Sequence, residues 1–326
     1  MIALIIALSI VMILLTVIFI LIEIFYKKFY YKRGDGAVCI KYQFFSDFPN
    51  LKRRKISFKS KKNILRGFIY NDKDIHEYKA LVVICHGIGY GHYYLFPWIN
   101  YLCKNGYLVL GYDATASNLS EGKRISSMLQ AIYDLNEALK FVENNKEFDK
   151  YRLYLFGHSM GGCASLNVLH YHHPRLEKVL TVAGFNNEAE EATAFNKAYT
   201  LLKPFLYIRN FFHYGRLAFF TGKSALKKTH AKVYYIQGEN DVVVPLSVGY
   251  NKFKNIRNPN VKCELIPNKG HTPFVSDKAQ EEQGKLLFNL GLLGGVLTPP
   301  TYVLNYKAIS EPDEKIYQKM INFFND

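Results

Sequence analysis

Cysteines are few in this 326-residue sequence, and their spacing does not suit cross-linking. The five cysteines are Cys39, Cys85, Cys103, Cys163 and Cys263. Their odd number, their wide spacing and the lack of any CxxC pair argue against a disulfide framework and against a zinc site. Reduced thiols fit a cytoplasmic domain. The sequence also lacks internal repeats and low-complexity tracts, and its 49% apolar content is ample for a buried core, so we do not expect a disordered chain.

Acidic residues are also scarce: 27 Asp and Glu stand against 42 Lys and Arg, for a net charge of +15. The excess is local, because residues 27–66 hold 13 Lys or Arg and two Asp, a net charge of +11. A basic segment beside a membrane attracts anionic lipid headgroups, by about 1 kcal/mol per residue near the surface. Nucleic acid is the competing partner, but the segment holds no recognisable nucleic-acid-binding motif, so we expect none.

The apolar run at the N-terminus lacks the features of a cleaved signal peptide. Residues 1–22 are apolar except for Ser9 and Thr16, and at about 1.5 Å per residue the run can cross the hydrocarbon core of a bilayer. A signal peptide would need a basic n-region, a shorter apolar region and a small-x-small cleavage site. We therefore predict a transmembrane anchor at 1–26 and a basic juxtamembrane segment at 27–55. The positive-inside rule then predicts a single-pass protein of the cell membrane with its catalytic domain in the cytoplasm.

Beyond the anchor, short apolar runs alternate with longer helical patterns, which predicts a mostly parallel sheet flanked by helices within one domain at 56–326. The expected strands are 55–58, 64–70, 80–87, 107–114, 152–159, 178–184, 232–240 and 261–268. The expected helices are 94–104, 126–145, 160–172, 247–255 and 312–324.

Two apolar segments interrupt this alternation. Residues 185–229 are rich in aromatics, with Lys203, Arg209 and Arg216 spaced along them, and residues 286–306 are broken by Gly and Pro and are too short to span a bilayer. Ordinary packing within the domain explains such apolar insertions as well as a role in substrate binding does. The functional hypothesis is a helical cap at about 185–229, with a lid, that together wall an apolar acyl pocket.

The segment "YLFGHSMGG" at 154–162 carries the strongest functional signal. It joins a strand to a helix through Gly157-His158-Ser159-Met160-Gly161, which is the G-x-S-x-G pattern of a nucleophile elbow. The turn is too tight for side chains two residues on either side of Ser159, so glycine is required at both places. The elbow would hold the hydroxyl of Ser159 at the end of the sheet, at the N-terminus of the following helix.

A serine nucleophile needs a histidine base that is itself oriented by a carboxylate, and in this fold the order along the chain is Ser, acid, His. Asp241 and His271 follow the last two expected strands, where sites form in open α/β sheets. Glu239 and then Glu188 are alternative acids. Together the three residues in this order predict a triad, although each of them alone has an ordinary structural explanation.

Two backbone N–H groups are expected to form an oxyanion hole. Met160, directly after the serine, supplies one. The loop "CHGIGYGH" at 85–92 supplies the other, which we assign to Ile88, with Gly87 and Gly89 letting the backbone approach.

The remaining reactive residue types have simpler explanations. His170, His172 and His173 could suggest a metal site, but they close a helix before Pro174, where cationic side chains favour the helix dipole. Cys163 is expected to pack within the helix after the elbow. We therefore expect no metal and no cofactor.

Taken together, the motifs "CHGIGYGH", "NLSEGKR", "GHSMGG", "GENDVVVP" and "NKGHTPF" resemble the α/β-hydrolase superfamily, nearest its serine aminopeptidase and monoacylglycerol lipase-like branch. The similarity covers roughly residues 56–324. It implies a triad of Ser159, Asp241 and His271 and an oxyanion hole at Ile88 and Met160. The chain departs from the family at 116–120, "ASNLS", where a Gly-His-Gly-x-Ser turn is common, so the family's substrate preference does not carry over.

These observations predict a membrane-anchored serine hydrolase, a lipase-like carboxylesterase for lipid-derived or other medium-to-long acyl esters. An aminopeptidase of the same fold is the alternative within enzymes, with "NEAEEA" at 187–192 as the one candidate site for a substrate amine. A catalytically silent binding module that works through its basic segment is the alternative outside enzymes. The sequence does not determine the oligomeric state.

Overall fold

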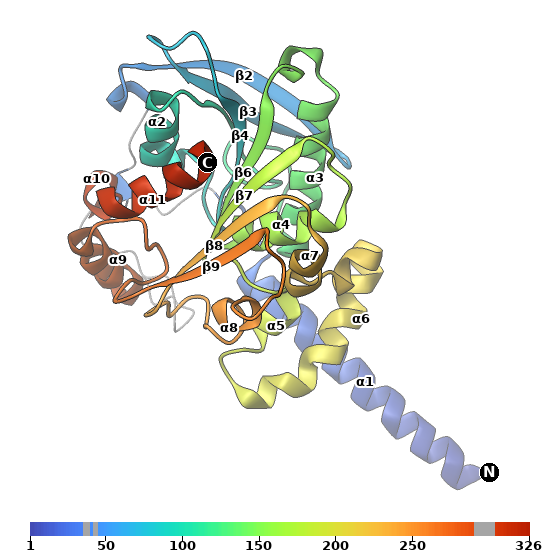
Figure 1. Ribbon diagram of the computed structural model, residues 1–326. Coiled ribbons are helices and arrows are strands. Elements are labelled where there is room, and N and C mark those ends of the chain that lie inside the picture. The colour runs from blue at the N-terminus through green and yellow to red at the C-terminus, as the bar shows by residue number, and fades with distance from the viewer. Residues whose placement is uncertain (35–39, 42–44, 290–303) are drawn as a thin grey trace.

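A twisted eight-stranded sheet forms the centre of the protein in a computed structural model, which describes residues 1–34, 40–41, 45–289 and 304–326 (Figure 1). Its strand order is β2-β3-β5-β4-β6-β7-β8-β9, with β2 and β3 antiparallel to their neighbours and the strands from β5 to β9 parallel. The strands are β2 (Leu51–Ser60), β3 (Asn63–Asp72), β4 (Ala80–Cys85), β5 (Leu108–Tyr112), β6 (Arg152–His158), β7 (Leu176–Val182), β8 (Lys232–Gly238) and β9 (Val261–Ile266). Each of the eight expected strands corresponds to one of these.

The sheet begins earlier than we expected. β2 starts at Leu51, so Lys52 to Lys55, which we assigned to the juxtamembrane segment, lie in the first strand. All four side chains are exposed. Four exposed residues in a row lack the alternation that marks a half-buried strand. Basic side chains on an edge strand also hinder unwanted pairing with other sheets.

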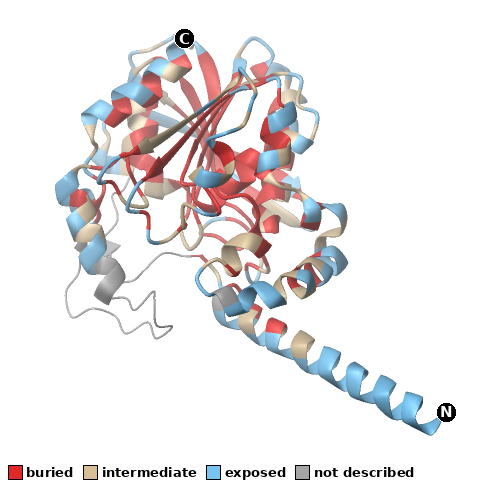
Figure 2. Ribbon diagram, turned by 60° about the horizontal axis from the view of Figure 1, so that its bottom comes forward, coloured by how far each residue is buried: buried red, intermediate tan, exposed pale blue. Residues whose placement is uncertain are grey.

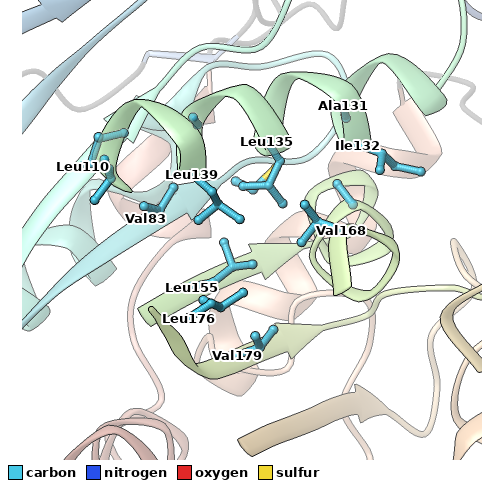
Figure 3. Packing of buried hydrophobic residues seen from close by; sticks show 14 of the residues in the cluster. Val83, Leu110, Ala131, Ile132, Leu135, Leu139, Leu155, Val168, Leu176 and Val179 are labelled. Carbon is cyan, nitrogen blue, oxygen red and sulfur yellow. The ribbon is translucent and has the colours of Figure 1, made fainter. Parts of the chain in front are cut away.

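Helices cover both faces of the sheet, as expected. On one face α2 (Phe96–Lys104) and α11 (Glu314–Asn325) pack around the fully buried Trp98. On the other face lie α3 (Leu129–Glu143), α4 (Met160–Asn167) and α7 (Gly222–Lys228). Figure 3 shows Leu135 and Leu139 of α3 directed toward Leu155 of β6. Burial of each such leucine contributes about 1.5–3 kcal/mol, so this layer fixes α3 and α4 against the strand that carries the elbow.

Shorter elements complete the described chain. They are β1 (Ile40–Lys41), β10 (Leu304–Asn305), α8 (Tyr250–Phe253), α9 (Asp277–Asn289), α10 (Tyr306–Ile309) and the 3-10 helices η1 (Phe45–Asp47), η2 (His92–Leu95), η3 (Lys146–Phe148) and η4 (Val168–His170). The helix α9 was not expected, because its sequence is polar and contains Gly284. Of the proposed lid at 286–306, residues 290–303 lie outside the described residues, as does Cys39.

The expected cap lies between β7 and β8 and is helical. It consists of α5 (Glu188–Ala192), η5 (Lys197–Leu202), α6 (Lys203–Tyr214), η6 (Gly215–Phe219) and α7. Figure 1 shows α5 and α6 beyond the sheet, beside the domain end of the first helix. The cap therefore sits at the edge of the sheet where the parallel strands end.

The first helix, α1 (Ile2–Phe29), projects away from the domain (Figure 2). It is long and apolar enough to cross a membrane, by length and composition. Residues 1–17 are exposed, whereas Ile22 and Tyr26 in the second half of the helix and Tyr30 directly after it are buried against the cap. The N-terminal part of α1 is therefore an exposed apolar helix, and the C-terminal part of the same helix packs into the domain.

We predict that Gly161→Ala destabilises the fold. A Cβ atom at residue 161 would overlap the carbonyl oxygen of Cys85 at the end of β4, and overpacking of this kind costs about 1–3 kcal/mol or more. Thermal unfolding in detergent, followed by the fluorescence of the single tryptophan, Trp98, measures the change.

Gly284→Ala in α9 is the matched control, because an added Cβ there meets nothing within 4 Å. Alanine is favoured over glycine in a helix by up to about 1 kcal/mol, so this variant should unfold at the same or a higher temperature. Equal unfolding temperatures for Gly161→Ala and the unmodified protein would contradict the proposed close contact.

Candidate active site

A strained turn presents Ser159 between β6 and α4. The backbone of Ser159 has φ 58° and ψ −118°, a conformation that residues other than glycine rarely adopt. Its amide donates to the carbonyl of Val182 at 2.9 Å, and its own carbonyl accepts the amide of Cys163 at 2.8 Å. The turn is therefore held on both sides, by the neighbouring strand and by the first turn of the helix.

Glycine is required on both sides of this turn. An added Cβ at Gly157 would overlap the carbonyl oxygen of Gly161, and one at Gly161 would overlap that of Cys85. The two glycines thus let the strand, the helix and the end of β4 meet within a single turn. This geometry matches the requirement that the G-x-S-x-G pattern predicts.

Three side chains distant in sequence meet at this turn. The Nε2 atom of His271 lies 2.9 Å from the hydroxyl oxygen of Ser159, and its Nδ1 atom lies 3.0 and 3.1 Å from the two carboxylate oxygens of Asp241. With the Nδ1 proton directed at the carboxylate, Nε2 is free to accept the serine proton. The arrangement is that of an activated nucleophile, its base and an orienting acid.

Asp241 is fixed in its ionised form. Its Oδ1 atom accepts the amides of Val243 at 3.0 Å and Val244 at 2.9 Å, and its Oδ2 atom accepts the side-chain amide of Gln237 at 3.2 Å. Burial alone would raise the pKa of Asp241, but the charge of His271 and these hydrogen bonds lower it below its ordinary value. The carboxylate is thus available to orient the imidazole across the neutral pH range.

The two alternative acids are engaged elsewhere. Glu239 accepts the amide of Asn268 at 3.3 Å. Glu188 is buried and accepts hydrogen bonds from the hydroxyl of Ser127, the amide of Met128 and the side chain of Asn210. Neither has a hydrogen bond to His271 among the described contacts, so the geometry selects Asp241.

The loop after β4 lies against the elbow. A Cβ at Gly87 would lie 3.4 Å from the Cβ of Ser159, so the backbone of this loop runs beside the serine, and Gly89 adopts a positive φ of 87°. Met160 opens α4, and the first N–H groups of a helix have no partner within it. Ile88 and Met160 are thus placed on the two backbone segments that flank Ser159, as the oxyanion-hole hypothesis requires.

Several supporting residues were not anticipated from the sequence. His86 donates from Nδ1 to the carbonyl of Gly87 at 2.7 Å and accepts the amide of Ala114 at Nε2, at 2.9 Å. Burial lowers its pKa, in keeping with a neutral ring. These bonds shape the loop on which Gly87 lies. A histidine directly after a buried apolar strand is the signal that could have identified it.

A second buried network fixes the next loop. Asp113, directly after β5, accepts the amide and the Nδ1 proton of His92, both at 2.8 Å, while the hydroxyl of Tyr70 donates to Nε2 at 2.7 Å. The second oxygen of Asp113 accepts from Asn118 and Leu119. The loops that carry the expected oxyanion donor and the unusual "ASNLS" segment are therefore tied to one carboxylate.

Two residues support His271. The ring of His158 lies 5.0 Å from that of His271, and its Nε2 atom is 3.2 Å from the carbonyl oxygen of His271. Burial and the charge of His271 lower the pKa of His158 to about 3, so His158 stays neutral. Lys269 is buried and binds the carbonyl of Val275 at 2.9 Å and Asp313 at 2.8 Å. This lysine fastens the histidine loop to the start of α11.

The other reactive side chains have structural partners. His170 donates from Nε2 to the carbonyl of Thr221 at 3.1 Å and stacks on Phe220, while His173 lies 2.8 Å from Glu143. Within the described ranges, no group of three His, Cys, Asp or Glu residues could hold a metal ion. Cys163 is buried, and burial raises its pKa, which suits packing rather than nucleophilic attack.

Comparison with known proteins identifies the fold. The sequence profile of the serine aminopeptidase S33 family matches residues 76–214. An esterase from Pyrococcus furiosus superposes with a TM-score of 0.57 and 19% sequence identity, over 79% of this chain and 98% of that chain.

The chain is an α/β hydrolase. An α/β hydrolase from Penicillium aligns with a TM-score of 0.52 and 16% identity, over 73% of this chain and 97% of that chain. A dienelactone hydrolase from Anabaena variabilis aligns with a TM-score of 0.51 and 16% identity, over 73% of this chain and 95% of that chain. No curated protein sequence matches significantly. The superfamily and the serine aminopeptidase branch that the motifs indicated are confirmed.

In this α/β hydrolase the domain end of α1 packs beside the candidate site. Tyr26 and Tyr30 belong to the same apolar cluster as Leu206 of the cap, and Ile88 and Met128 pack against it. These two residues lie beside the elbow and in the loop before α3. The N-terminal helix thus contributes to the wall around the hydrolase's candidate oxyanion loop.

Two residues that follow α1, Arg33 and Gly34, bind the "ASNLS" segment and the residues next to it. Gly34 donates to the carbonyl of Ala116 at 2.8 Å and accepts the amide of Asn118 at 3.3 Å. The guanidinium of Arg33 donates to the carbonyls of Asn118, Ser120 and Gly122. The departure from the family pattern therefore coincides with the place where Arg33 and Gly34 bind.

We predict that Glu191 in α5 makes stability depend on pH. Burial and the charge of Glu188 raise the pKa of Glu191 to about 8, so the folded hydrolase holds a proton that the unfolded chain releases near its ordinary value of 4.5. The stabilising contribution is complete below about pH 4.5 and is lost as the pH rises through about 8.

Glu191→Gln should therefore raise the unfolding temperature progressively more, relative to the unmodified hydrolase, between pH 5 and pH 8.5. Glu281→Gln, at an exposed position of α9, is the control and should leave the pH profile unchanged. Parallel profiles for Glu191→Gln and the unmodified protein would show that the carboxyl group does not retain its proton.

Proposed function

We propose that this α/β hydrolase is a membrane-anchored serine hydrolase that cleaves carboxylic esters by way of an acyl-enzyme. The observation that carries the proposal is the continuous hydrogen-bonded chain from Ser159 through His271 to Asp241. A serine on a strained, glycine-flanked turn has few structural uses, and its contact with an oriented histidine supplies the base that a hydroxyl nucleophile needs.

The chemistry follows from the geometry. As the hydroxyl oxygen of Ser159 attacks the acyl carbonyl, its proton passes to Nε2 of His271, and Asp241 stabilises the imidazolium. His271 then returns the proton to the departing alcohol, which leaves an acyl group on Ser159. Water then attacks this ester while it loses a proton to the same Nε2 atom. The bond between the acyl carbon and the oxygen of Ser159 breaks, the acid is released, and Nε2 returns the proton to Ser159.

The amides of Ile88 and Met160 would bind the negative oxygen of the tetrahedral intermediate. They lie on the two backbone segments next to Ser159, and Met160 begins the helix α4, whose N-terminus favours negative charge. Each backbone donor of this kind typically contributes about 10²–10³-fold to the rate. The reaction as written uses only groups of this chain and water.

The anchor and the cap support a lipid-derived or other medium-to-long acyl ester as substrate. The apolar helix α1 would hold the domain at the cell membrane, with the basic segment and the catalytic domain in the cytoplasm. The apolar cluster of Tyr26, Tyr30 and Leu206, against which Ile88 packs, makes the surroundings of the candidate site apolar, as an acyl substrate would require. The structurally similar esterase from Pyrococcus furiosus is a further reason to favour esters.

A fluorophosphonate probe tests the nucleophile. We expect membranes that contain the unmodified protein to be labelled, and Ser159→Ala and His271→Ala each to lose labelling and to reduce ester turnover by about 10⁴-fold or more. Ser57→Ala, on the exposed edge strand β2, is the matched control and should label normally. A folded wild-type protein that stays unlabelled would favour the silent binding module instead.

The substrate preference predicts a chain-length dependence. With p-nitrophenyl esters presented in detergent micelles, kcat/KM should rise from acetate to octanoate by about tenfold or more, since each added CH₂ that is buried contributes about 0.8 kcal/mol. Much faster turnover of acetate than of octanoate would argue for a small acyl pocket.

Aminopeptidase activity is the second candidate, because α5 brings three glutamates to the cap. Glu188 is satisfied by protein donors and Glu190 pairs with Lys252 at 2.8 Å, which leaves Glu191 as the residue able to meet a substrate amine. Comparison of an aminoacyl p-nitroanilide with its N-acetylated form distinguishes the two functions: an aminopeptidase needs the unmodified amine.

A further inference from the structure

The outer surface of the cap is unusually apolar. Among the described residues that follow α1, nine large apolar side chains are exposed, and seven of them belong to the cap. These seven, which we call the cap patch, are Phe195, Tyr199, Leu201, Ile208, Phe211, Phe212 and Phe219. Leu201 and Phe212 are each 79% exposed, and aromatic contacts join Phe211 to both Phe212 and Phe219. Exposed apolar side chains concentrated in one insertion in this way mark an interaction surface.

The helix α6 has two distinct faces. Leu206, Arg209 and Asn210 are buried, whereas Ile208, Phe211 and Phe212 are exposed at the spacing of one helical face. The buried face carries the polar network and the exposed face is apolar. This is the reverse of an ordinary surface helix, so the exposed face is suited to an apolar environment.

Beyond α5, the charge of the cap is of one sign. Residues 193–229 contain no Asp or Glu. They contain seven basic residues: Lys197, Lys203, Arg209, Arg216, Lys223, Lys227 and Lys228. Lys and Arg beside exposed Phe and Leu are typical of segments that lie in the interface of an anionic membrane. The composition thus favours a lipid surface over an acidic or purely apolar protein partner.

Contacts with α1 place the cap at the level where the anchor leaves the bilayer. The rings of Phe19 and Phe205 are 6.1 Å apart, and Nε of Arg209 lies 2.7 Å from Oε1 of Glu23. Residues 1–22 are the apolar run, and Glu23 is its first charged residue. The helix α6 therefore meets α1 across the boundary between the apolar run and the polar residues that follow.

A buried network fixes α6 to α1 at this height. The guanidinium of Arg209 lies 3.4 Å above the ring of Tyr26 and donates to the hydroxyl of Tyr31 at 3.0 Å. Tyr26 in turn donates to Asn210, which binds Glu188 of α5. Arg209 is buried, so breaking its contacts with Glu23, Tyr26 and Tyr31 would leave an uncompensated charge inside the protein, and the cap cannot easily move away from α1.

We propose that the cap patch lies in the interfacial layer of the same bilayer leaflet from which α1 emerges, with its apolar side chains among the acyl chains and the exposed basic residues of the cap at anionic headgroups. The inference rests on the proposed membrane anchoring. The hydrolase is then held at the membrane by two adjoining surfaces, and the mouth of its site has a fixed orientation toward the lipid.

Tryptophan probes in the full-length chain test this arrangement. The single natural tryptophan, Trp98, is fully buried and gives a constant background. Leu201→Trp and Phe212→Trp report on the cap patch, Leu8→Trp on the anchor, and Lys146→Trp, in the exposed η3 turn before β6, on the opposite end of the sheet. Each variant is reconstituted in nanodiscs of phosphatidylcholine and phosphatidylserine, with or without brominated acyl chains.

We expect brominated lipid to quench the added fluorescence at positions 8, 201 and 212 and to leave that at 146 unquenched. Blue-shifted emission at 201 and 212 should accompany the quenching. Quenching at 201 and 212 no greater than at 146, while position 8 is quenched, would overturn the proposal and leave the anchor intact. Blue-shifted but unquenched emission at these positions would also overturn it, because a second copy of the chain would then cover the patch.

The same samples separate this inference from the proposed function. Fluorophosphonate labelling of each variant reports on Ser159 independently of lipid contact, and none of the four positions belongs to the candidate active site. Loss of quenching at position 8 would refute the membrane anchor, and with it the present proposal. Normal labelling together with unquenched cap probes would refute only the docking of the cap.

Discussion

The absence of a side chain at residue 161 is the constraint on which the candidate site depends. With no Cβ there, the first turn of α4 approaches the carbonyl at the end of β4, and the loop after β4 lies beside Ser159. The serine accepts an unfavourable backbone conformation as a result. Such strain persists only when surrounding contacts over-determine it, and the hydrogen bonds to Val182 and Cys163 do so.

From this turn outward, each side chain of the site is fixed by a second contact. Asp241 is held by two backbone amides, and the loop of His271 by buried Lys269 and its bond to Asp313. His158 fills the space beneath the imidazole while remaining neutral, so it adds no charge that would compete for the proton. Three residues supported in this way would need little rearrangement to act as the proposed triad.

The sequence predicts the sheet and the triad for clear physical reasons. Buried parallel strands are continuous apolar runs, and a triad in this fold follows a fixed order along the chain. The predicted start of β2 was wrong by several residues. Lys52 to Lys55 are all exposed on an edge strand, so their sequence does not show the alternation of apolar and polar residues that marks a half-buried strand. The helix α9 was missed because its polar sequence with Gly284 has no apolar face that periodicity could reveal.

What the sequence could not predict is the contact between the anchor and the cap. Glu23 and Arg209 are 186 residues apart, and no local pattern relates a glutamate at the end of an apolar run to an arginine in an aromatic insertion. Their meeting follows only from the tertiary fold, which brings the insertion between β7 and β8 to the edge of the sheet where the anchor arrives. The consequence is physical: a helix joined by a flexible linker would leave the domain free to rotate relative to it, whereas the ion pair of Glu23 with the buried Arg209 and the hydrogen bonds of Gly34 hold α1 in one orientation. In this hydrolase the N-terminal helix is therefore part of the domain's own packing.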